Sequence, residues 1–188
     1  MSDPVTPLKG ARYDGFCQIT EIGPRGMIAL RGDLVALAGT LRAVAGLDMP
    51  CQRQVTVAGG NACAWMSPDE VLLMLPRPEV EGALAQLAAA LQNLHHLAAD
   101  VSDARALLRI TGPLAREVLA KLTPADVSPA GLPVGELRRT RLAQVPAALR
   151  VIAEGEVEVI CFRSVAQYVF DLLSMAARPG GEVTLFRA

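Results

Sequence analysis

The residue types that most often perform chemistry are scarce in this sequence, and their spacing does not bring them together. Four cysteines occur, at Cys17, Cys51, Cys63 and Cys161. They form no CxxC pair and no zinc-finger spacing, so reduced thiols in a cytoplasmic protein are expected. The two histidines, His95 and His96, are adjacent. Neighbouring side chains on a regular element diverge, so this pair is predicted to end a helix and not to chelate a metal.

Two glycine-containing segments share some features with anion-binding loops. TVAGGNA, at 56–62, lies between two predicted strands and does not open a helix, so a hairpin is favoured over a phosphate loop. In LRITGPLARE, at 108–117, a glycine does precede a helix, but Pro113 removes one of the amide groups that an anion would use. The sequence has no GxGxxG, P-loop or GxSxG motif.

The remaining polar candidates fit structural roles. Ser164 follows Arg163 at the end of a predicted strand, and with no histidine nearby in sequence it is expected to cap a helix and not to act as a nucleophile. Asp100 and Asp103 flank a turn, where turn and cap chemistry explains them better than an acid–base pair. The chain is therefore predicted to be non-catalytic, with no catalytic, cofactor-binding or metal-binding residues of its own.

Composition narrows the class of partner. Of the 188 residues, 52% are hydrophobic, and the mean hydropathy is +0.33. No apolar run reaches the roughly 18 residues that cross a bilayer, and the N-terminus lacks the apolar stretch of a signal peptide, so no membrane is expected. The apolar excess fits an alanine-rich core and a surface covered by another protein equally well. A net charge of −1 and 4% aromatic residues do not fit a nucleic-acid binder.

Regular elements are predicted from Met27 onward. Residues 1–26 are rich in proline and glycine without sustained periodicity, which predicts an extended or mobile N-terminal arm. Residues 27–188 are predicted to form a single domain. Its first half should have strands at 27–32, 52–58, 62–66 and 71–76 and helices at 34–45 and 78–94. Its second half should have strands at 104–112, 139–145, 147–154 and 156–162 and helices at 113–122 and 164–177.

The two halves repeat one pattern. The order strand–helix–strand–strand–strand–helix occurs in pseudo-repeats at about 27–97 and 98–178, and alignment places Gly32 over Gly112 and Glu70 over Glu156. A duplicated β-α-β-β-β-α unit predicts an α+β fold of two antiparallel sheets with helices packed on them.

The last predicted helix is apolar on nearly all sides and needs two surfaces to bury it. One is its own sheet, and the other is either the second half of the chain or a partner protein. Partner contacts are therefore assigned to Tyr168 and Phe170 on this helix. Arg139, Arg141 and Arg163 are added because a guanidinium pairs with carboxylates across interfaces.

An ordered set of segments resembles a known family. The segments are IALRGD at 28–33, AWMSPDEVLLMLP at 64–76, DVSDAR at 100–105, LRITGPLAREVLAKL at 108–122, RRTRLAQV at 138–145 and FRSVAQYVFDLL at 162–173. Together they resemble the folate-binding aminomethyltransferase (T-protein) superfamily and, within it, the gamma subunits of heterotetrameric sarcosine oxidases.

The resemblance implies a folate-binding-domain-like fold and an accessory, non-catalytic role. Such complexes oxidatively demethylate sarcosine to glycine, with hydrogen peroxide and either formaldehyde or 5,10-methylenetetrahydrofolate as the other products. The partners implied are the alpha, beta and delta subunits, chiefly the large one, and the FAD, FMN, NAD, zinc and tetrahydrofolate implied for the complex belong to them. The alternative is a stand-alone folate-binding protein of the iron–sulfur enzyme maturation type, whose K-G-C-[YI]-x-G-Q-E segment this sequence lacks.

Overall fold

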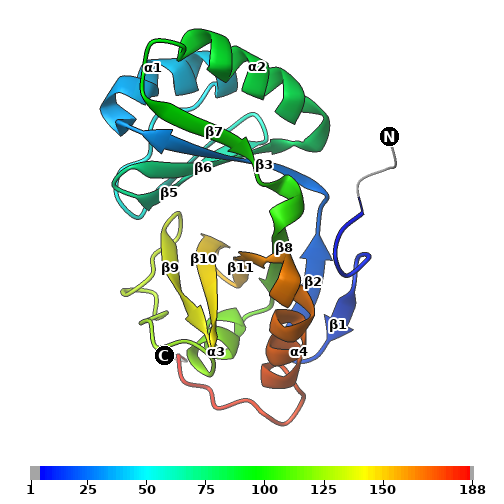
Figure 1. Cartoon of the computed structure of the whole chain (residues 1–188). Helices are drawn as coiled ribbons and strands as arrows, with labels where there is room; N and C mark the ends of the chain where they lie inside the picture. Colours follow the sequence, from blue (N-terminus) through cyan, green and yellow to red (C-terminus); the bar gives the residue numbers. More distant parts are fainter. Residues whose placement is uncertain (1–4, 187–188) are drawn as a thin grey trace. The chain divides into compact units, whose positions relative to one another are not determined.

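The computed structural model describes residues 5–186 (Figure 1), and the chain divides into two compact units. Unit 2 comprises residues 24–103, and unit 1 comprises the segments on either side, up to Gly23 and from Ala104 onward. Each unit is built on one antiparallel sheet.

Unit 2 has a five-stranded sheet in the order β4-β5-β6-β3-β7. Its elements are β3 (Arg25–Gly32), α1 (Leu34–Ala45), β4 (Val55–Ala58), β5 (Asn61–Ser67), β6 (Glu70–Pro76), the 3-10 turn η1 (Arg77–Glu79), α2 (Val80–Ala90), β7 (His96–Asp100) and the 3-10 turn η2 (Ser102–Ala104), which ends at the border of unit 1. Figure 1 shows α1 and α2 together over one face of this sheet.

Unit 1 has a six-stranded sheet in the order β1-β2-β8-β11-β10-β9. Its elements are β1 (Arg12–Asp14), β2 (Gln18–Ile22), β8 (Arg105–Thr111), α3 (Ala115–Ala120), β9 (Leu137–Leu142), β10 (Val145–Ala153), β11 (Glu156–Phe162), the 3-10 turn η3 (Arg163–Val165) and α4 (Ala166–Ala176). Helices α3 and α4 contact each other, and both pack against β11.

Alternation along the strands builds a separate core in each unit. In unit 2, Leu37 and Leu41 of α1 and Leu87 of α2 pack on strand residues such as Ile28 and Leu73, all at most 1% exposed. Unit 1 repeats this arrangement. Its fully buried core residues include Val118 and Leu119 of α3, Val169 and Leu173 of α4, and Ile19, Leu108, Leu149, Val159 and Leu142 of the sheet. Helices with one buried stripe need such a sheet face to be stable.

The predicted duplication is confirmed in backbone detail. Gly32 and Gly112 both have positive φ, at 151° and 147°, and each amide donates to the turn before β6 or β11: Gly32 to the Asp69 oxygen at 3.0 Å and Gly112 to the Gly155 oxygen at 2.8 Å. A Cβ on Gly112 would lie 2.8 Å from the Cys17 Sγ, so close approach adds to the backbone requirement for glycine.

The N-terminal arm is the largest departure from prediction. Residues 12–14 and 18–22 are strands, and Cys17 and Ile19 are core residues at 2% and 0% exposure, so the prediction of an arm without core elements is wrong for this stretch. Residues 1–4 lie outside the described residues. The alternation of buried and half-buried positions in QITEI is only five residues long and was hidden by flanking glycines.

The strand that precedes each repeat belongs to the sheet of the other repeat. β2 leads into β3 of unit 2 yet pairs with β8 of unit 1, and β7 leads into β8 yet pairs with β3. The register places Cys17 beside Gly112 in unit 1 and His96 opposite Gly32 in unit 2. The duplicated unit therefore has one more strand than predicted, and it is exchanged between the halves.

Two helix boundaries differ from the prediction. α2 ends at Ala90, so the two histidines do not end a helix, and His96 instead begins β7. No side-chain cap precedes η3 or α4, so the expected capping role of Ser164 is wrong. By contrast, Asp33 caps α1 by accepting from the amides of Val35 and Ala36, and Gly46 ends it in the left-handed conformation.

Candidate partner-binding surfaces

Helix α4 has one face in the core of unit 1 and an exposed apolar stripe. Val169 and Leu173 are fully buried, and Phe170 is half-buried against the same core. Tyr168 is 42% exposed and Met175 is 52% exposed. Because residues seven apart lie on one side of a helix, these two side chains form a stripe on the exposed side. The core of unit 1 thus buries one face of α4, and Tyr168 lies on the face that this core does not cover.

The turn into α4 adds an aromatic and a cationic group. The Phe162 ring is 44% exposed and lies under the Arg105 guanidinium, 4.8 Å from the ring centroid. Arg163 donates to the backbone oxygen of Val5 at 3.0 Å. Arg163 is thus held by the N-terminal segment, close in sequence to the α4 stripe.

Arg139 and Arg141 lie on a different part of unit 1. Both are exposed on β9, the edge strand of the six-stranded sheet, opposite Ala148 and Pro146 of β10. Exposed charges on an edge strand hinder unwanted strand pairing. The five predicted contact residues therefore form two groups, one at α4 and one at the β9 edge.

The cysteines are free thiols and three are buried. Burial raises the pKa of the Cys63 thiol to about 12 and that of Cys161 to about 11, and it raises the pKa of Cys17 as well. A thiol that stays protonated is a poor nucleophile and a poor metal ligand. Only Cys51 is exposed among them.

Asp100, the last residue of β7, and Asp103, in η2, have the structural role that was predicted. Asp100 accepts from the amide of Ser102 at 2.9 Å, which closes the turn, and Arg77 donates to Asp100 at 2.8 Å and to Asp103 at 2.6 Å. The pKa of the Asp100 carboxyl is lowered although its burial favours the neutral form, because the hydrogen bonds from Ser102 and the Arg77 guanidinium stabilise the charge.

Across residues 5–186, no group of three or more His, Cys, Asp and Glu side chains is placed to hold a metal ion. Within the same part of the chain, no helix is both long enough and apolar enough to cross a membrane.

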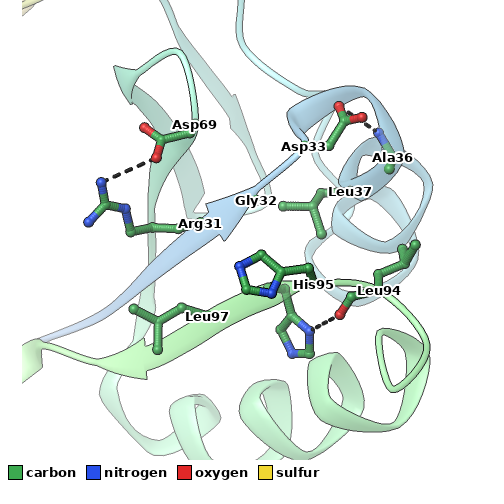
Figure 2. A pocket seen from close by; sticks show the side chains of 10 residues that line it. Arg31, Gly32, Asp33, Ala36, Leu37, Asp69, Leu94, His95 and Leu97 are labelled. Carbon is green, nitrogen blue, oxygen red and sulfur yellow. Dashed lines mark hydrogen bonds and ion pairs between the residues drawn. The ribbon is translucent and has the colours of Figure 1, made fainter.

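A hollow of about 740 Å³ in unit 2 was not predicted from the sequence. It lies where β3 leads into α1 and where β7 begins, and Figure 2 shows the side chains around it. Its apolar lining includes Ala36, Leu37, Leu94 and Leu97, and its polar lining is Arg31, Asp33, Asp69, His95 and His96. The residues come from three segments that are distant in sequence, so no local motif indicated it.

The charges around this hollow are largely engaged and are acidic on balance. Arg31 pairs with Asp69 at 3.2 Å and with Glu70 at 3.4 Å. Asp33 accepts the two amides that open α1, so the helix N-terminus is already capped. His96 Nδ1 lies 2.9 Å from the Leu94 backbone oxygen. The one guanidinium of the lining is paired with two carboxylates, and Asp33 adds a third negative charge, which makes the wall unsuited to an anion.

Unit 1 has a buried carboxylate that the sequence did not indicate. Glu117 of α3 is 1% exposed, and it accepts the backbone amides of Val183 at 2.6 Å and Thr184 at 2.7 Å, with Leu185 at 3.4 Å. Lys121 lies 3.3 Å from Glu117. Thr184 has φ 58°, and this left-handed conformation turns successive amides toward one acceptor. The segment after α4 is thereby fixed to α3.

Comparison with known proteins gives one consistent relationship. A model of the sarcosine oxidase, gamma subunit family matches residues 31–178. The sarcosine oxidase subunit gamma of Arthrobacter sp. is 35% identical over 130 residues, which covers 69% of this chain and 62% of that protein. The subunit gamma of Corynebacterium sp. strain P-1 is 36% identical over 145 residues, covering 72% and 67%. The match therefore spans less than two thirds of the Arthrobacter protein.

Solved structures give the same result for the fold. A chain of the heterotetrameric sarcosine oxidase from Corynebacterium sp. U-96, in complex with pyrrole 2-carboxylate, has a TM-score of 0.82 and 25% identity, covering 94% of this chain and 95% of that chain. The glycine cleavage system aminomethyltransferase T from Bartonella henselae has a TM-score of 0.63 and 15% identity, covering 85% and 45%. The second likeness shows that the predicted T-protein-like fold is correct.

Proposed function

Because the chain belongs to the sarcosine oxidase gamma subunit family, we propose that it is the accessory, non-catalytic gamma subunit of a heterotetrameric sarcosine oxidase. That complex would oxidatively demethylate sarcosine to glycine, producing hydrogen peroxide and either formaldehyde or 5,10-methylenetetrahydrofolate. The observation that carries the proposal is the fit of nearly the whole chain to a chain of a solved heterotetrameric sarcosine oxidase, at 95% coverage of that chain.

The proposal assigns the chemistry to the alpha, beta and delta subunits, which would hold FAD, FMN, NAD, zinc and tetrahydrofolate. The hollow of unit 2 supports the assignment of tetrahydrofolate to another subunit. Its one guanidinium is paired with Asp69 and Glu70, so the hollow would repel the carboxylates of a folate. The free cysteines support a reducing, cytoplasmic location. The internal repeat supports the view that both units form a single folate-binding-domain-like domain.

The partner contacts follow from the exposed groups of unit 1. We assign Tyr168, Phe170 and Arg163 to an interface with the large subunit, because an exposed aromatic close in sequence to a cationic group is typical of interface centres. Arg139 and Arg141, on the β9 edge, would pair with carboxylates at a second point of contact.

Co-expression tests the proposal. The tagged chain is produced with the three other subunits of a sarcosine oxidase, purified by its tag, and examined by absorption spectroscopy and by a peroxide assay. A yellow complex that contains this chain in equal proportion and releases peroxide only with sarcosine is the expected result. A colourless chain that purifies alone and binds a reduced folate would overturn the proposal in favour of a stand-alone folate-binding protein.

A further inference from the structure

The internal repeat allows the hollow of unit 2 to be compared with the same place in unit 1. With Gly32 over Gly112, the lining residues Ala36 and Leu37 of α1 correspond to Arg116 and Glu117 of α3. Glu117 is the residue that binds the segment after α4 through the amides of Val183 and Thr184. In unit 1, the place that corresponds to the hollow is therefore covered by an extended segment of the chain itself.

A second contact supports this correspondence. In unit 1 the Phe16 amide donates to the Ala177 oxygen, at the end of α4, at 2.9 Å, and Lys121 donates to the oxygens of Ala176 and Gly181. These bonds place the segment from Ala176 to Leu185 beside α3, and Figure 1 shows it running from α4 past α3. In unit 2 the chain passes from α2 through residues 91–95 into β7, so the described residues of this unit include no free segment after the helix.

Within the described part of the chain, the sheet of unit 2 also lacks a strand that the sheet of unit 1 has at the corresponding edge. In unit 1, β1 pairs with β2 at the sheet edge, whereas β7, the counterpart of β2, is itself an edge strand. Leu97 on β7 lines the hollow and is 52% exposed, and Leu94 is 43% exposed. An exposed apolar edge strand next to a hollow accepts extended polypeptide through backbone pairing and side-chain insertion. Unit 1 fills both positions with its own segments, β1 and residues 176–185, whereas among the described residues no segment of unit 2 fills either.

We propose that the hollow and the adjoining edge of β7 bind an extended segment of another subunit of the complex. The inference rests on the proposed function. Ala36, Leu37 and Leu97 suit an apolar side chain of that segment. Asp33 and Asp69 on the rim suit a flanking basic side chain, since the wall is acidic on balance. Unit 2 would thus be completed by its partner as unit 1 is completed by its own chain.

Filling the hollow tests the proposal. Ala36 lies in it and is exposed, so Ala36→Trp occupies the space without disturbing the core. Its neighbour Val35 is 87% exposed and does not line the hollow, so Val35→Trp is the matched control on the same helix turn. We expect Ala36→Trp to weaken assembly of the heterotetramer by roughly tenfold or more, as for loss of one packed anchor, with Val35→Trp at the wild-type value.

A photo-crosslinking residue at Leu97 identifies the occupant in the assembled complex. A crosslink to a peptide of another subunit, with a basic residue beside an apolar one, is expected. Equal assembly of both tryptophan variants, or a crosslink only to a second copy of this chain, overturns the docking site while leaving the proposed function intact. Failure of the wild-type chain to assemble overturns both.

Discussion

The carboxylate of Glu117 is expected to hold the segment after α4 in place, and Glu117→Gln tests this with almost no change in shape. The buried carboxylate accepts two short bonds, from the amides of Val183 at 2.6 Å and Thr184 at 2.7 Å, one on each oxygen. Glutamine replaces one oxygen with an NH₂ group, so at least one amide then faces a donor. A hydrogen bond to a charged group contributes about 1.5 to 3 kcal/mol, and we expect docking of the segment to weaken by about 2 to 4 kcal/mol.

Hydrogen exchange followed by mass spectrometry measures this loss directly. Amides at 183–185 should exchange roughly thirtyfold to seven-hundredfold faster in the variant, at 1.4 kcal/mol per factor of ten. Glu182→Gln is the control, because it removes the same charge from an exposed position in the same segment. Unchanged protection at 183–185 in Glu117→Gln would refute the assignment of Glu117 as the group that holds the segment.

The pH dependence gives a second measurement on the same group. Burial by itself would raise the pKa of Glu117. The hydrogen bonds from Val183, Lys121, Thr184 and Leu185 lower it by a larger amount, so the pKa lies below its ordinary value of 4.5. A lowered pKa in the folded state means that this stabilisation is complete above about pH 4.5. It is lost as the pH falls through the folded value. Protection at 183–185 should therefore fall with acid in the wild type and be low at every pH in Glu117→Gln.

Further predictions concern the exposed and buried sides of unit 1. Tyr168→Ala should leave the melting temperature of the lone chain unchanged but weaken assembly, whereas Phe170→Ala should lower the free energy of unfolding by about 2 to 4 kcal/mol in chemical denaturation; the reverse pattern would contradict the placement of α4. Gly112→Ala should lower the free energy of unfolding by about 1 to 3 kcal/mol in the same assay, because its Cβ would clash with the Cys17 Sγ and φ at this position is 147°. A variant as stable as the wild type would contradict the close approach of Cys17 to Gly112. A thiol reagent at pH 8 should modify Cys51 rapidly and the three buried thiols only after unfolding; rapid modification of more than one thiol would contradict the burial.

Local rules predicted much of the fold. Asp33 and Gly46 mark the two ends of α1 because capping depends on neighbouring residues only. The apolar runs of β6 and β11 and the turns before them fixed the alignment of the halves. What the sequence did not reveal are β2 and β7, five-residue strands that pair with segments tens of residues away. Their pairing partners decide their structure, and their own short patterns do not.

The candidate sites were predicted less well, for a related reason. Tyr168 could be singled out because a helix that is apolar on most sides signals a second contact. The hollow of unit 2 requires β3, the start of α1 and the start of β7 to meet, and the role of Glu117 requires a contact with residue 183, 66 positions away. A sequence pattern cannot distinguish a buried carboxylate with three amide donors from an exposed one on a helix.

The differences between the two halves identify where each half meets something else. At equivalent positions of the first helix, unit 2 has Ala36, Leu37 and Leu41, and unit 1 has Arg116, Glu117 and Lys121. Each of the three charged groups has a task within unit 1. Arg116 is 6% exposed and donates to the backbone oxygens of residues 127, 128 and 132, while Glu117 and Lys121 hold the segment after α4.

Buried charges are costly unless they are paired, and the two buried charges of α3 in unit 1 are paired: Arg116 with the backbone oxygens of residues 127–132 and Glu117 with the amides of the segment after α4. The unit 2 counterparts carry no such cost and leave an apolar floor beneath an acidic rim. The two halves share one backbone pattern but differ at this position: unit 1 has the segment after α4 bound there, and unit 2 has the hollow. The difference indicates that the two positions bind different segments. The occupant of unit 1 is part of the chain, and the experiment with Ala36→Trp asks whether that of unit 2 is the partner.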